Sequence, residues 1–138
     1  MHKNFIPAIE QAIALNTADK MGATDKAMDE FITRCGCDKA ALKKKHLPDG
    51  KNSMRFPFTS TRKRMSTIIE NATGKGGYDK RIFIKGGSDV ILDICNKYMD
   101  ENGEIKPLTD VVKGSVNNII NKFAADALRT LCLAYKDI

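Results

Sequence analysis

One stretch in the first half of the chain combines the residue types that a nucleotide site needs. It reads Phe56-Pro57-Phe58-Thr59-Ser60-Thr61-Arg62-Lys63-Arg64-Met65-Ser66. An aromatic face stacks on a planar base, which is worth about 1–3 kcal/mol per base, and Lys and Arg side chains attract phosphate. The same residues also fit two ordinary core phenylalanines followed by a solvated basic turn. The stretch alone leaves both interpretations open.

The flanking residues must position this stretch. Apolar side chains alternate with Arg55 and Pro57 over residues 54–58, which predicts a strand. Residues 65–69 are rich in β-branched side chains and predict a second strand, with a bend at 59–61 between the two. Residues that leave one strand and enter the next can point to the same mouth of a sheet. The pattern therefore favours a ring and several cations around one opening.

A second candidate is Lys85-Gly86-Gly87, at the end of a strand predicted over 80–85. Ser88 is predicted to cap the helix that follows, with Asp89 in its first turn. Glycines let a ligand approach the backbone, and free amides at a helix start attract anions. A plain strand-to-helix turn explains the same residues equally well.

The remaining pattern predicts the fold class. Further helices are expected with caps at Asn4, Thr24 and Thr109, a short helix at 39–44, and loops at 48–50 and 74–77. Apolar spacing predicts buried stripes that include Phe31, Ile94, and residues 112–127 of the last helix. Residues 128–135 are apolar on both faces and predict a central strand. Because the middle strands have short connections, we expect an α/β fold of the α+β type, with a largely antiparallel, twisted sheet flanked by helices.

Length and composition set limits on function. The 138 residues suit a single domain, and 42% of them are hydrophobic, which is enough for a core. The net charge of +6 favours anionic partners without distinguishing ATP from nucleic acid or a membrane surface. Neither a bilayer-spanning apolar run nor a signal-peptide pattern occurs, so the polypeptide is expected to be soluble.

Metal binding is not predicted. The four cysteines are Cys35, Cys37, Cys95 and Cys132, and the Cys-x-Cys pair lacks a second pair at zinc-ligand spacing. Thiols kept reduced in the cytosol are the better interpretation. The glycines at 74–77 do not match a phosphate-binding P-loop, since G-x-x-x-x-G-K-[ST] is absent.

A basic nucleic-acid-binding module is the alternative function. Residues 39–64 contain nine Lys and Arg residues against a single acid, Asp49. Such a module should show a steep salt dependence and cover several nucleotides. A third interpretation is a regulatory interaction domain that no longer binds nucleotide, in which Phe58→Ala would change nothing.

Several motifs in one order resemble a known family. They are Phe58–Ser66, Lys85-Gly86-Gly87 and Ala127-Leu128-Arg129-Thr130-Leu131-Cys132-Leu133-Ala134-Tyr135, together with Ile13-Ala14-Leu15-Asn16 and Gly22-Ala23-Thr24-Asp25-Lys26-Ala27. The chain resembles, over nearly its whole length, the cytosolic nucleotide-binding domain of P-type ATPases. Calcium pumps of the plasma-membrane, calmodulin-regulated kind, including their plant relatives, are the most similar.

The resemblance implies a set of ATP-binding residues. Phe58 matches the aromatic that stacks on adenine, and Asp25 the acidic residue near the adenine amino group. Lys63 matches the lysine beside the nucleotide, and Arg129 the arginine that reaches the phosphates. Lys85 and Gly86 match residues that line the depth of the pocket, and Lys85 would also offset triphosphate charge. Gly87 stands where the family more usually has Ala.

Two other departures affect expected contacts. Asp25 is one methylene shorter than the usual Glu, so its contact with the base is expected to run through water. Ser60 stands where relatives of the sarcoplasmic-reticulum type carry an arginine, which removes one phosphate contact.

The resemblance also implies what lies outside the chain. The family phosphorylates the Asp of an Asp-Lys-Thr-Gly-Thr segment, which this sequence lacks. Residues 1–138 are therefore expected to be one nucleotide-binding domain, a cytoplasmic fragment of a larger membrane pump that is both hydrolase and translocase. It should bind ATP, as Mg-ATP in the full pump, and not hydrolyse it. The expected partners are the phosphorylation and actuator domains, with no nucleic acid, and the membrane only through missing transmembrane helices.

Overall fold

The computed structural model describes residues 5–17, 20–47, 53–70 and 79–138. The loops expected at 48–50 and 74–77, and the cap at Asn4, lie outside these ranges. The elements along the chain are α1 (Ile6–Ala14), α2 (Ala23–Arg34), α3 (Lys39–His46), β1 (Ser53–Phe56), β2 (Arg64–Ile69), β3 (Arg81–Gly87), α4 (Ser88–Ile94), β4 (Lys97–Met99), β5 (Ile105–Pro107), α5 (Asp110–Ala125) and β6 (Leu131–Asp137).

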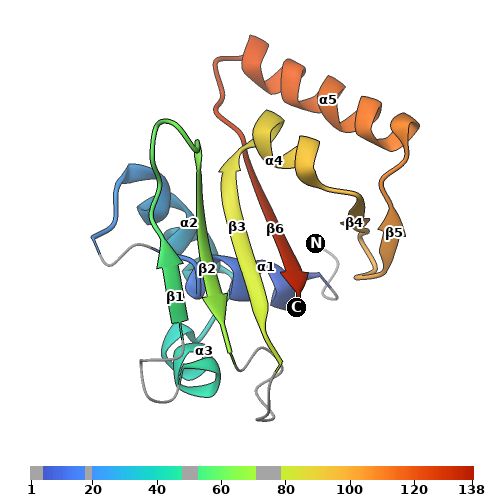
Figure 1. Cartoon of the computed structure of the whole chain (residues 1–138). Coiled ribbons are helices and arrows are strands. Elements are labelled where there is room, and N and C mark those ends of the chain that lie inside the picture. Colours follow the sequence, from blue (N-terminus) through green and yellow to red (C-terminus); the bar gives the residue numbers. More distant parts are fainter. Residues whose placement is uncertain (1–4, 18–19, 48–52, 71–78) are drawn as a thin grey trace.

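The main sheet has the strand order β1-β2-β3-β6, and every neighbouring pair is antiparallel. This confirms the predicted α+β fold. Strands β4 and β5 form a separate hairpin that the sequence interpretation missed. Figure 1 shows α1 and α2 behind the main sheet, α3 below the end at which β1 begins, and α4 and α5 beyond the opposite end.

The last strand is an edge strand, so the prediction of a central strand is wrong. It also begins at Leu131, later than predicted. The apolar pattern on both faces has a different cause, because helices α1 and α4 both contact β6. Two helices thus give an edge strand the composition that usually marks a central one.

Two predicted helix caps are also wrong. Gly22 occupies the N-cap of α2, and Thr24 lies within the first turn beside Asp25. Gly87 occupies the N-cap of α4, and Ser88 is its first helical residue. The Ser88 hydroxyl instead donates a hydrogen bond of 2.9 Å to Thr130 Oγ1, just before β6. A tertiary partner has therefore replaced the local capping interaction.

The predicted cap at Thr109 is confirmed. Thr109 caps α5 by accepting a hydrogen bond of 3.3 Å from the Val112 amide. Gly36 follows α2 in the left-handed conformation, with a φ of 83°.

The core lies between α1 and the sheet. Buried Ala12, Leu15, Ile69 and Phe83 pack together, with Leu133 and Tyr135 against them. A second cluster of Ile13, Ala14 and Ile32 joins α1 to α2. Three predicted stripes are only partly buried: Phe31 and Ile94 are 41% and 55% exposed, and α5 buries no residue. Helix α2 packs mainly on α1 and α5 mainly on α4, so part of each apolar face remains accessible, and Ile94 is the last residue of α4.

Candidate functional site

Strand register brings the predicted site residues to one end of the sheet. Phe56 pairs with Ser66, Arg64 pairs with Gly86, and Gly86 pairs with Cys132. Strand β1 therefore ends where β2 begins, where β3 ends and where β6 begins, as Figure 1 shows. Phe58 follows β1, Lys63 precedes β2, Gly87 ends β3, and Arg129 precedes β6. Three stretches that are distant in sequence, around residues 58–63, 85–87 and 129, thus meet at one end of the sheet.

Asp25 and Lys85 form a direct ion pair. Lys85 Nζ lies 2.5 Å from Asp25 Oδ1, and the two side chains are only 8% and 12% exposed. On β3, Phe83 points into the core beneath α1, and Lys85, two residues on, lies on the same face of the strand. The pair joins α2 to β3 and leaves little of the lysine charge uncompensated.

The loop between β1 and β2 presents Phe58 to solvent, with 60% of its surface exposed. Arg62 holds this loop closed: its guanidinium donates hydrogen bonds of 3.1 Å to the Pro57 carbonyl and to Ser66 Oγ. The same guanidinium lies 5.9 Å from the centre of the Phe56 ring. Arg62 is thus internal to the loop and is not an outward-facing basic residue.

Gly86 is required by the neighbouring strand. A Cβ at this position would lie 2.5 Å from the Lys63 carbonyl oxygen and 3.1 Å from the Arg64 Cβ. Lys63 itself adopts a left-handed conformation, with a φ of 55°, and its amide donates to the Thr59 carbonyl at 2.7 Å. The close approach of residues 63 and 64 is thus by itself a structural reason for a residue without a Cβ at this position.

Arg129 is exposed and follows a specific helix end. Ala127 has a φ of 57°, and the Leu128 amide donates to the Phe123 carbonyl at 2.9 Å. This is the hydrogen bond of a Schellman cap, with alanine in the place that glycine usually takes. The cap turns the chain out of α5 and delivers Arg129 to the sheet edge.

Two positioning features escaped the sequence interpretation. Buried Asn16 accepts a hydrogen bond of 2.7 Å from Thr67 Oγ1 and donates one of 3.4 Å to the Met65 carbonyl. These bonds fix β2 against α1, and Met65 is the direct strand partner of Lys85. In the sequence Asn16 only ends an apolar run, which does not show what its side chain contacts. Arg62 was taken as an ordinary cation because sequence does not show what a side chain faces.

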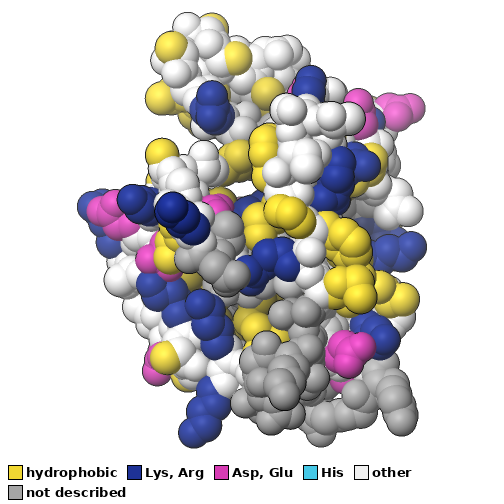
Figure 2. Space-filling model, turned by 60° about the vertical axis from the view of Figure 1, so that its left-hand side comes forward, with side chains coloured by type: hydrophobic (Ala, Val, Ile, Leu, Met, Phe, Trp, Pro, Cys, Tyr) yellow, Lys and Arg dark blue, Asp and Glu magenta, His cyan; other side chains and the backbone are white. Residues whose placement is uncertain are grey.

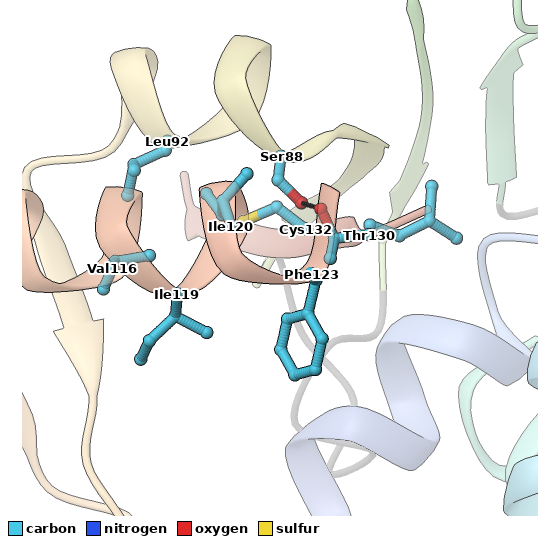
Figure 3. A pocket seen from close by; sticks show the side chains of 9 residues that line it. Ser88, Leu92, Val116, Ile119, Ile120, Phe123, Thr130 and Cys132 are labelled. Carbon is cyan, nitrogen blue, oxygen red and sulfur yellow. Dashed lines mark hydrogen bonds between the residues drawn. The ribbon is translucent and has the colours of Figure 1, made fainter. Parts of the chain in front are cut away.

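The structure also contains a groove away from the predicted site residues. An apolar groove of about 200 Å³ runs between α4, α5 and the start of β6, and Figure 3 shows the side chains that line it. Its polar members are Ser88 and Thr130, which are hydrogen-bonded to each other. None of the seven predicted site residues lines this groove.

The molecular surface carries more basic than acidic side chains on the face shown in Figure 2, where the β1 side of the sheet comes forward. Part of the basic run at 39–64 is internally paired, since Lys39 Nζ lies 2.7 Å from Asp29 Oδ1. Within the described ranges, no group of three or more His, Cys, Asp or Glu side chains is arranged so that it could hold a metal ion. None of the described helices combines the length and apolar character needed to cross a bilayer.

Comparison with known proteins identifies the family. A sequence model described as "P-type ATPase, cytoplasmic domain N" matches residues 10–138. The chain belongs to the P-type ATPase family. The match spans all the described elements except the start of α1. The end of the sheet where the predicted site residues meet is therefore part of domain N.

Individual relatives are calcium-transporting ATPases. The chain is 50% identical over 82 residues to "Calcium-transporting ATPase 3, plasma membrane-type" of Oryza sativa subsp. japonica, covering 59% of this chain and 8% of that protein. It is 41% identical over 123 residues to "Calcium-transporting ATPase 4, plasma membrane-type" of Arabidopsis thaliana, covering 89% and 11%. It is 36% identical over 147 residues to "Calcium-transporting ATPase PAT1" of Dictyostelium discoideum, covering 98% and 12%. The chain thus spans only about an eighth or less of these relatives.

Proposed function

We propose that residues 1–138 are one ATP-binding domain of a calcium-transporting P-type ATPase, on the cytoplasmic side of the membrane. The observation that supports this best is the Asp25–Lys85 ion pair at the sheet edge that also carries exposed Phe58. In this proposal adenine stacks on Phe58, Asp25 is near its amino group, and Lys85 with Gly86 and Gly87 lines the depth of the pocket. Lys63 and Arg129 face the phosphates.

The division of charge follows from the geometry. Asp25 already compensates most of the Lys85 charge, whereas Lys63 and Arg129 are exposed. We therefore assign the larger part of the triphosphate contact to Lys63 and Arg129. Lys85 acts mainly at the base end of the nucleotide, where its ammonium group fixes the position of the carboxylate.

The domain would present ATP to another part of the same polypeptide. The γ-phosphate projects from the sheet edge toward a phosphorylatable Asp in the phosphorylation domain, and the actuator domain is the further partner. Mg²⁺ usually binds through substrate phosphates and one or two carboxylates, so it would arrive with ATP. This chain supplies base stacking, orientation and phosphate charge, and we expect no hydrolysis by it alone.

The affinity of this domain for ATP should be low. One stacked base and a few exposed charge contacts, less the cost of association, suggest about −4 to −5 kcal/mol, or sub-millimolar to millimolar dissociation constants. The 60% exposure of Phe58 supports this estimate, because an open platform excludes little water.

Titration with Mg-ATP, followed by backbone amide chemical shifts, tests the proposal. Saturable shifts should appear around residues 56–66, 85–87 and 129. Phe58→Ala should weaken binding roughly tenfold, given about 1–3 kcal/mol for base stacking. Phe123→Ala is the matched control, since Phe123 is an exposed phenylalanine (42%) in α5 that is not among the predicted site residues.

Two outcomes would contradict this function. Saturable shifts that avoid Phe58, Lys85 and Arg129 would place the nucleotide elsewhere. Binding of a single-stranded oligonucleotide that outcompetes ATP and falls steeply with salt would instead favour the nucleic-acid module.

A further inference from the structure

The hydroxyl groups of Ser88 and Thr130 join two segments that each lead into the proposed ATP site. Ser88 directly follows Gly87, the last residue of β3, and Thr130 directly follows Arg129. The hydrogen bond between the two hydroxyl oxygens is 2.9 Å long, although forty-two positions separate the residues in sequence. Figure 3 shows this bond among the side chains that line the apolar groove.

The position of this bond follows from the strand register. Strands β3 and β6 pair antiparallel, and their last pair at this end of the sheet is Gly87 with Leu131. One step further along the same register places Ser88 opposite Thr130. At this step the backbones separate, because β3 passes into α4 whereas residues 128–130 come from the end of α5. The side-chain bond therefore holds the two segments together where the strand pairing ends.

The bond anchors a short connection that carries Arg129. Ser88 is buried, with 7% of its surface exposed, and Thr130 is partly buried. Arg129 lies between the cap at the end of α5 and the Thr130 anchor. Because α5 buries no residue, the cap by itself would make the position of Arg129 depend on a peripheral helix. The Thr130 anchor ties Arg129 to the main sheet instead.

We propose that Ser88 and Thr130 are positioning residues for Arg129, and that their hydrogen bond holds the guanidinium where it meets the triphosphate of ATP. This role rests on the proposed function, in which Arg129 faces the phosphates. A long side chain on a loosely held backbone must be ordered when the nucleotide binds, which costs conformational entropy. A connection that is already held in place lowers that cost. The bond strengthens the phosphate contact in this way, and neither hydroxyl needs to touch the nucleotide.

Thr130→Val tests this role, because valine keeps the shape of threonine and removes the hydroxyl. Titration with Mg-ATP should show an affinity reduced roughly two- to tenfold, which corresponds to ordering one rotamer-rich side chain on binding. Titration with adenosine, which has no phosphate, should give the same affinity as the unmodified chain. Ser88→Ala removes the donor of the same bond and should give the same pair of results. Thr130→Ser keeps a hydroxyl and should retain ATP affinity.

A double-variant cycle separates this role from a general loss of structure. In an Arg129→Ala background, Thr130→Val should leave Mg-ATP affinity unchanged, because the group that it positions is absent. In a Lys63→Ala background, Thr130→Val should keep its full effect, since Lys63 belongs to the connection between β1 and β2. Thr33→Val is the matched control. It removes an exposed hydroxyl that donates to the Asp29 carbonyl within α2, and it should change neither affinity.

The possible outcomes distinguish the positioning role from the proposed function. If Mg-ATP causes no saturable shifts in the unmodified chain, the proposed function fails and the positioning role fails with it. If Mg-ATP binds at the proposed residues but Thr130→Val and Ser88→Ala leave its affinity unchanged, only the positioning role is overturned. An equal loss of adenosine and ATP affinity, or a full effect of Thr130→Val in the Arg129→Ala background, would also overturn it, because the bond would then act on the fold as a whole.

Discussion

The Lys85 ammonium and the Asp25 carboxylate lie 2.5 Å apart in a nearly closed environment, with 8% and 12% of their side chains exposed. The two residues are sixty positions apart in sequence, and their contact links α2 to β3. A pair with this little solvent differs from a surface ion pair, whose net contribution is about 0–1 kcal/mol. Removal of one partner leaves a charge that water cannot fully solvate.

We therefore predict that Lys85→Met lowers the free energy of unfolding by about 3–5 kcal/mol, because the Asp25 carboxylate loses its partner. Asp25→Leu combined with Lys85→Met should recover most of that loss, since apolar groups replace both charges. Chemical denaturation of the two single variants and the double variant measures the coupling free energy between Asp25 and Lys85.

The exposed Arg34–Glu30 pair is a suitable control for this cycle. Its side chains are 78% and 62% exposed, so Arg34→Met should change stability by no more than about 0.5 kcal/mol. A double variant at Asp25 and Lys85 that is less stable than either single one would show that the ion pair itself stabilises the domain.

Two glycines should respond to alanine in opposite directions. Gly86→Ala should destabilise the domain by about 1–3 kcal/mol, because its Cβ would collide with the Lys63 carbonyl at 2.5 Å. Gly114→Ala should stabilise it by about 0.5–1 kcal/mol, because Gly114 lies within α5 and a Cβ there meets nothing within 4 Å.

Thermal and chemical unfolding of both glycine variants provide the comparison. If Gly86→Ala matched the unmodified chain in stability, the close approach of β2 to this residue would not be a real constraint. The same variant should shift the amides of Lys63 and Arg64, because these residues must move to admit the methyl group.

Local patterns in the sequence predict much of the fold. Alternation around Phe56 and the β-branched run at 65–69 predict adjacent antiparallel strands, and both exist. The Thr109 cap and left-handed Gly36 also follow from local chemistry. These features depend on residues within one or two turns, where sequence spacing determines which groups can meet.

Long-range contacts were not predictable from the residues alone. The Ser88 hydroxyl was expected at a helix cap, but its partner is Thr130, forty-two positions later. Likewise, the sequence gives no sign that the Lys63 carbonyl would lie 2.5 Å from a Cβ at Gly86. Composition predicts which groups need partners, and only the tertiary arrangement decides which partner each one has. The family resemblance, which draws on whole motifs, added Asp25 and Arg129 to the candidate site, which local spacing did not connect with the Phe58 loop.

Arg62 should control how the Phe58 loop is held. Arg62→Ala removes two hydrogen bonds, to the Pro57 carbonyl and Ser66 Oγ, and the contact with the Phe56 ring. We predict a loss of about 1–2 kcal/mol in stability, since the guanidinium is only partly buried. If Phe58 forms the base platform, Mg-ATP affinity should also fall severalfold because the loop must then be ordered on binding.

Calorimetry and the amide-shift titration separate these two effects for Arg62. Arg62→Lys keeps the charge but cannot form both hydrogen bonds in the same planar geometry, so it should resemble Arg62→Ala more than the unmodified chain. Full retention of affinity in Arg62→Lys would instead assign Arg62 a purely electrostatic effect.

The end of α5 offers a stabilising substitution. Ala127 has a φ of 57°, a left-handed conformation that costs a residue with a Cβ about 1–2 kcal/mol. Glycine avoids this penalty but loses more conformational freedom on folding, by about 0.5–1 kcal/mol. Ala127→Gly should therefore raise the free energy of unfolding by up to about 1 kcal/mol. Ala124→Gly, three residues earlier and within regular helix, should lower it by about 0.5–1 kcal/mol because it has only the entropic cost.

The two alanine-to-glycine changes should alter the free energy of unfolding in opposite directions, so each variant serves as the control for the other. Both remove one exposed methyl group from the same end of α5, so differences in packing are small. Chemical denaturation of the two variants measures the difference directly. Equal destabilisation by both would mean that Ala127 is not left-handed in solution and that the turn leading to Arg129 has another conformation.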